Sequence, residues 1–125
     1  MNYKDLNVYK RAYKVAIDLH HFLEANPKIP SHLLNRLQTM SREVLANIAE
    51  SSAQRTTKAK RFFNFKARDL IRLIQMDLDF LHDIKLLPED SYTLFYNEYE
   101  VCSKQLFKLN QSFLEKQEVK VAVAA

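Results

Sequence analysis

The chain has 125 residues and a net charge of +4 but no glycine, which excludes the glycine-rich phosphate loops of P-loop and dinucleotide-binding proteins. Sheet proteins usually need glycine at hairpins and bulges, so its absence favours long helices joined by short turns. A single cysteine excludes an internal disulfide. No apolar run approaches the roughly 20 residues of a membrane span, and the first residues lack the apolar core of a signal peptide. We therefore expect a cytoplasmic protein without a membrane partner.

The first half of the sequence predicts two amphipathic helices, at about residues 5–25 and 31–52. Apolar residues recur in both segments at spacings of three and four, as expected for one buried helix face. Pro27 disfavours helical backbone at Asn26 and so ends the first helix, while Ser31 is suited to cap the second. The predicted buried face of the second helix consists of Leu33, Leu37, Met40, Val44 and Ile48.

The third helix is predicted at about residues 57–85 and has more apolar residues than one buried face needs. One stripe contains Phe63, Ala67, Leu70, Ile74, Leu78 and Leu81. Four further apolar residues lie partly off this stripe and suggest a second buried face, namely Phe62, Phe65, Leu73 and Phe80.

The fourth helix is predicted at about residues 88–116, after a restart marked by Pro88. Its apolar residues recur with a strict 3.5-residue period, which is typical of near-parallel helix packing. They are Tyr92, Phe95, Tyr99, Cys102, Leu106, Leu109 and Phe113.

Four amphipathic helices joined by short turns predict an all-α fold, an antiparallel up-down-up-down four-helix bundle. A domain of this size buries roughly two-thirds of its unfolded surface, which is enough for a core. We expect residues 1–116 to form this single domain and residues 117–125 to form a flexible C-terminal tail.

Charge is distributed unevenly along the second half of the chain. Residues 55–72 contain seven bases against Asp69, a net charge of +6. Residues 73–100 contain seven acids against Lys85, a net charge of −6. In the predicted bundle these two groups lie at opposite ends. The seven bases are Arg55, Lys58, Lys60, Arg61, Lys66, Arg68 and Arg72.

Three interpretations of the basic segment stay open. The bases could bind the phosphates of RNA or DNA and release counterions. They could instead meet the acidic end of another copy in an oligomer, or they could form a solvated helix face. The neighbouring phenylalanines could stack on nucleic-acid bases, join the core or pack against a neighbouring subunit; they are Phe62, Phe63 and Phe65.

Few residues suggest catalysis or metal binding. The Asp18–His21 and Asp79–His82 pairs distantly resemble the motifs of di-metal bundles, but both lie off the apolar stripes. Cys102 lies within a buried stripe without a nearby activating base, as a structural thiol would. We therefore expect no metal, no cofactor and no enzymatic activity.

Three short runs carry a resemblance to a known family. The runs YKDLNVYKRA at residues 3–12, ANIAE at residues 46–50 and FFNF at residues 62–65 resemble the bacterial four helix bundle protein family. Its members are also described as proteins encoded by 23S ribosomal RNA intervening sequences. The resemblance spans about residues 3–115 and implies a closed four-helix bundle that assembles into a five-fold ring, with no recognised catalytic residues.

The resemblance also implies similarity to the accessory variability protein of diversity-generating retroelements. That relative is a basic, barrel-shaped pentamer that partners a reverse transcriptase and contacts nucleic acid. The third helix of this chain begins with more bases than is usual in the family, which favours this branch. We therefore expect a non-catalytic, ring-forming adaptor that binds RNA or DNA through the seven bases. The alternative is a structural oligomerisation module with no nucleic-acid role.

Overall fold

The computed structural model describes residues 2–124, so Met1 of the predicted domain and Ala125 of the predicted tail lie outside it. Over this range the chain is helical and has no strand, which confirms the prediction of an all-α fold with four long helices. None of these helices is both long and apolar enough to cross a membrane. The elements are η1 (Tyr3–Asp5), α1 (Asn7–Glu24), α2 (Ser31–Ala53), α3 (Thr57–Asp83) and α4 (Glu89–Ala124).

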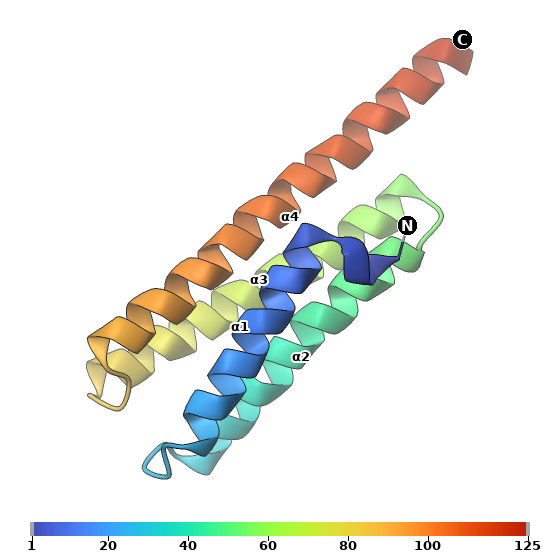
Figure 1. Cartoon of the computed structure of the whole chain (residues 1–125). Coiled ribbons are helices and arrows are strands. Elements are labelled where there is room, and N and C mark those ends of the chain that lie inside the picture. The colour runs from blue at the N-terminus through green and yellow to red at the C-terminus, as the bar shows by residue number, and fades with distance from the viewer. Residues whose placement is uncertain (1, 125) are drawn as a thin grey trace.

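The four helices lie side by side as a bundle (Figure 1). The α1–α2 and α3–α4 turns lie at one end, at the lower left of Figure 1, and the α2–α3 turn lies at the other end with the N-terminal residues. Each helix packs against the two helices beside it, and α1 lies diagonally opposite α3. The outer face of α3 is therefore remote from α1.

Apolar side chains from all four helices form one core. The buried face predicted for α2 is confirmed, because all five of its residues are buried. In α4 the middle of the predicted stripe, from Phe95 to Leu106, is buried as well. In α3 the core includes Ile71, which the predicted stripe omitted, whereas Phe63 and Leu70 are only half-buried.

Two asparagines lie inside the core near the α2–α3 turn. Asn64 is 0% and Asn110 is 2% exposed. The Asn64 Nδ2 donates to Asn110 Oδ1 at 3.0 Å, and Asn110 Nδ2 donates to the Arg61 carbonyl at 3.3 Å. The Asn64 Oδ1 has no hydrogen-bond partner among the described residues. Because buried amides pair well in only one alignment, this contact sets the position of α3 along α4.

The ends of α3 follow recognisable capping patterns. The Thr56 hydroxyl accepts from the Ala59 amide at 3.1 Å and so caps the N-terminus of the helix. At the other end Lys85 has a φ of 69°, and the Leu86 amide donates to the Leu81 carbonyl at 2.9 Å. Glycine usually takes such a left-handed position, so Lys85 strains the backbone by about 1–2 kcal/mol in a chain that has no glycine.

The fourth helix continues through Ala124, so its predicted end at residue 116 is wrong. The prediction followed the last apolar residue of the stripe, Phe113, but residues 117–124 contain no proline or glycine that would stop a helix. Residues 115–124 are all exposed, and the last turns project beyond the other helices (Figure 1). The segment predicted as a flexible tail is therefore a helical extension up to Ala124.

The asparagine pair gives a testable stability difference. Changing Asn110→Leu leaves Asn64 buried without its acceptor, so we expect a loss of about 1–3 kcal/mol in the free energy of unfolding. The double variant Asn64→Leu/Asn110→Leu removes both polar groups and is expected to lose less than the two single variants together. Urea denaturation measures all three. Strictly additive losses would contradict the coupling between the two side chains.

Candidate nucleic-acid interface

The seven predicted bases lie together along one segment of the fold. Arg55 is in the α2–α3 turn, and the other six are in the N-terminal half of α3. Lys60, Arg61 and Arg68 are partly buried, and the remaining four are exposed. We call this group the basic surface: Arg55, Lys58, Lys60, Arg61, Lys66, Arg68 and Arg72.

Almost none of this positive charge is neutralised within residues 2–124. Of the seven bases only Arg72 has an acidic partner, Asp69, at 3.4 Å. The Lys60 ammonium donates to the Ser52 carbonyl at 3.4 Å, and Arg68 Nε donates to the Ser103 hydroxyl at 3.4 Å. Neutral acceptors leave the net charge unchanged, so the basic surface retains a strong attraction for an anionic partner.

Phenylalanine rings lie against several of these cations. The Lys66 Nζ is 5.4 Å from the centre of the Phe62 ring, and the Arg61 guanidinium is 5.3 Å from that of Phe65. Such cation–π contacts orient the charged groups without neutralising them. Phe62 and Phe65 are 55% and 43% exposed, so neither belongs to the core of this chain.

Helix α4 adds two bases that sequence reasoning missed. Lys116 and Lys120 are one helical turn apart and line, with Arg55, a groove of about 520 Å³ between the α2–α3 turn and the end of α4. Lys116 was predicted as the last residue of the fourth helix and Lys120 as part of the tail, so the two lysines were not placed together beside Arg55. Their four-residue spacing was the available signal, since it continues the spacing of Lys104 and Lys108 in the same helix.

The basic surface invites comparison with known nucleic-acid-binding proteins. No family model, curated protein or solved structure matches this chain. The resemblance carried by the runs at residues 3–12, 46–50 and 62–65 therefore stays a prediction.

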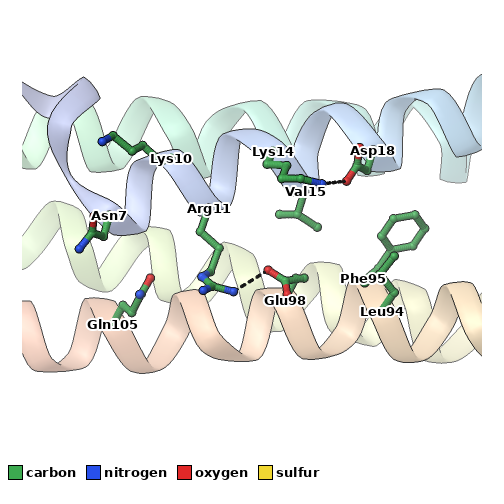
Figure 2. A pocket seen from close by; sticks show the side chains of 10 residues that line it. All are labelled: Asn7, Lys10, Arg11, Lys14, Val15, Asp18, Leu94, Phe95, Glu98 and Gln105. Atoms are coloured by element: carbon green, nitrogen blue, oxygen red, sulfur yellow. Dashed lines mark hydrogen bonds and ion pairs between the residues drawn. The ribbon is translucent and has the colours of Figure 1, made fainter.

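Another groove lies between α1 and α4 and has a volume of about 580 Å³ (Figure 2). Figure 2 shows Arg11 reaching from α1 to Glu98 on α4, where the two charged groups lie 2.8 Å apart. Lys14 pairs with Asp18 at 2.9 Å along α1. Both acids that line the groove are thus engaged by bases, and the Arg11–Glu98 pair connects α1 with α4.

The acidic end of the bundle contains one histidine cluster. The His82 Nε2 lies 2.5 Å from a Glu89 carboxylate oxygen, and the ring stacks on Tyr92 at 4.3 Å. The Tyr92 hydroxyl donates to Asp79 at 2.6 Å, which raises the pKa of that phenol to about 12. Across residues 2–124 no three His, Cys, Asp or Glu side chains lie close enough together to hold a metal ion.

The thiol of Cys102 is fully buried in the core beside Tyr99. Burial is the main cause that raises the pKa of Cys102, to about 12. A thiol with that pKa forms almost no thiolate near neutral pH, and the thiolate is the reactive species. The position predicted from the α4 stripe is confirmed as a buried one.

Burial of Cys102 has a measurable consequence for its chemistry. At pH 8 we expect the folded protein to react with a disulfide reagent at least about 100-fold more slowly than the unfolded chain, because burial suppresses the thiolate and blocks access. Absorbance of the released chromophore in buffer and in urea measures both rates. Fast stoichiometric labelling of the folded protein would contradict a buried, inert thiol.

Proposed function

We propose that the protein is a non-catalytic adaptor that binds RNA or DNA through its basic surface. The observation that carries this proposal is the basic surface, in which only one of the seven bases, Arg72, pairs with an acid, Asp69, within residues 2–124. Lys116 and Lys120 of α4 add two more bases beside Arg55. Regularly spaced phosphates fit such an extended group of cations better than a compact anion does. Contacts of this kind position a nucleic acid without reading its sequence, so we expect little sequence preference.

The adaptor is further proposed to be an antiparallel up-down-up-down bundle that acts in the cytoplasm. Turns at alternate ends of the bundle support this topology (Figure 1). In this arrangement the start of α3 and the end of α4 come to the same end, which places Lys116 and Lys120 beside Arg55. The single cysteine is compatible with a reducing compartment.

The resemblance supplies two further parts of the proposal, a ring of five copies and a reverse transcriptase as candidate partner. A ring would repeat the basic surface around one axis, and avidity would then convert weak contacts into tight binding. The basic start of α3 supports the retroelement branch of the resemblance.

Salt dependence tests the role of the basic surface directly. The double variant Lys58→Ala/Lys120→Ala removes two exposed charges at the basic end. For single-stranded RNA we expect the slope of log affinity against log salt to fall by roughly 1.4 in a one-copy complex, because each lost phosphate contact contributes about 0.7. Fluorescence anisotropy from low to moderate salt measures the slope.

The matched control for this experiment is Lys10→Ala/Lys28→Ala. These two lysines are also exposed, but Lys10 lies on α1, which does not pack against α3, and Lys28 lies in the α1–α2 turn at the opposite end of the bundle. For the control we expect the same slope of log affinity against log salt as for the original protein. Tight binding whose affinity does not change with salt concentration would contradict the proposed site. An equal decrease of the slope in both double variants would contradict it as well.

A second candidate function is a structural oligomerisation module with no nucleic-acid role. The apolar side chains exposed on the outer face of α3 favour it, because they suggest that another protein surface covers them. In this case the purified protein should carry no nucleic acid by its absorbance ratio at 260 and 280 nm. Light scattering should also show an assembly that dissociates at high salt, if the basic and acidic ends pair between copies.

A further inference from the structure

Helix α3 has a second apolar face that no described part of the chain covers. Its side chains recur at helical spacing on the side opposite the core and are between 39% and 56% exposed. A patch of this kind, on the order of several hundred Å², usually marks an interaction site. Asp69 interrupts it, and Lys66 and Asp83 lie at its edges. We call it the outer stripe: Phe62, Phe65, Leu73, Met76, Phe80 and Ile84.

A second exposed apolar feature lies on another side of the bundle, between α1 and α2. It is a groove of about 420 Å³, and its apolar lining includes Tyr13, Ala16, Ile17 and Leu45. Tyr13 and Ile17 are 51% and 41% exposed although both stand in the middle of a regular helix. We call this feature the α1–α2 groove.

We propose that the outer stripe of one copy docks into the α1–α2 groove of the next copy. This inference rests on the assembly part of the proposed function and names the surfaces that make the contact. Because α1 lies diagonally opposite α3, the outer face of α3 points away from the α1–α2 groove of the same copy. A contact between two different surfaces is head-to-tail, and such contacts close into rings when the rotation between copies permits.

The two surfaces lie at the same height along the bundle. Ile17 is seven residues before the end of α1 at Glu24, and Met76 is seven residues before the end of α3 at Asp83. Both helices end at the same end of the bundle (Figure 1). At 1.5 Å per residue, each side chain lies about 10 Å from that end. Copies arranged around an axis parallel to their helices keep a common height, so the two surfaces meet.

The outer stripe is longer than the α1–α2 groove, and a part of it at the height of the groove matches the groove in length. The α1 side of the groove runs from Tyr13 to His20, and the matching part of the outer stripe runs from Leu73 to Phe80, eight residues in each case. Phe62 and Phe65 lie beyond this contact, beside the basic surface. The contact therefore leaves the basic surface exposed except at Arg72, which lies beside Leu73 at the edge of the contact.

Charges of opposite sign lie at one edge of the contact. Asp79 and Asp83 flank the matching part of the outer stripe towards the α3–α4 turn, Arg72 flanks its other end, and Arg42 lines the α1–α2 groove together with His20. Arg42 has no acidic partner within residues 2–124. Opposite charges at the rim of an apolar contact orient the partners and disfavour other pairings.

A complementation experiment tests the contact. The stripe variant Met76→Glu and the groove variant Ile17→Glu each damage one surface at a side chain that is exposed, so both should fold, as circular dichroism will show. By size-exclusion light scattering we expect the original protein to assemble and each variant to be monomeric. An equimolar mixture should form a one-to-one pair, because the intact stripe of one variant meets the intact groove of the other.

The control variant is Asn97→Glu, an exposed position on α4 outside both surfaces, which should keep the original mass. A monomeric original protein would overturn the proposal. So would a groove variant that keeps its full mass, because that result indicates stripe-to-stripe contact about a two-fold axis. Failure of the mixture to pair would overturn it as well.

Nucleic-acid binding separates this inference from the proposed function. Monomeric stripe and groove variants retain the basic surface, so each should still bind single-stranded RNA in a salt-dependent way, with an affinity at least about tenfold lower through lost avidity. An assembly that forms through the two surfaces but never binds RNA or DNA would refute the adaptor role and leave the contact intact.

Discussion

The packing of α3 against both α2 and α4 is the constraint on which most other features depend. Its buried residues, such as Ile71, Ile74 and Leu78, allow only one rotation of the helix about its axis. Asp77 adds to this, since its carboxylate accepts two bonds from Arg36 of α2, at 2.6 and 2.9 Å. With the rotation set, the bases at the start of α3 and the apolar residues on its far side must both point outward.

The separation of charge along the bundle gives the molecule an electric dipole along its long axis. A polyanion approaching the protein is attracted to the end with the α2–α3 turn and repelled from the end with the α3–α4 turn. Ion pairs inside the bundle do not cancel this asymmetry, because most of them join residues far from the basic surface, such as Arg11 and Glu98. In an assembly with parallel helices, every copy would present the same end to the same side.

Periodicity along the chain was enough to predict the helices, the buried face of α2 and the middle of the α4 stripe. Local patterns could not show that Asn64 and Asn110 are buried, because polar residues enter a core only when a partner on another helix satisfies them. They also placed the end of α4 at the end of its apolar stripe, and so missed Lys120 as a neighbour of Arg55. Exposure of Phe62 depends on the rotation of α3, which only the packed helices determine.

The projecting end of α4 has a consequence for the energetics of binding. Residues 115–124 bury almost no surface, so their helical state depends on intrinsic propensity and on backbone hydrogen bonds exposed to water. Such turns unfold and refold in a local helix–coil equilibrium, because unfolding them requires little free energy. Phosphates bound between Lys116, Lys120 and Arg55 would favour the helical state of these turns. Helix formation in this segment and ligand binding are therefore thermodynamically linked. The tip of α4 would then report occupancy through slower amide hydrogen exchange.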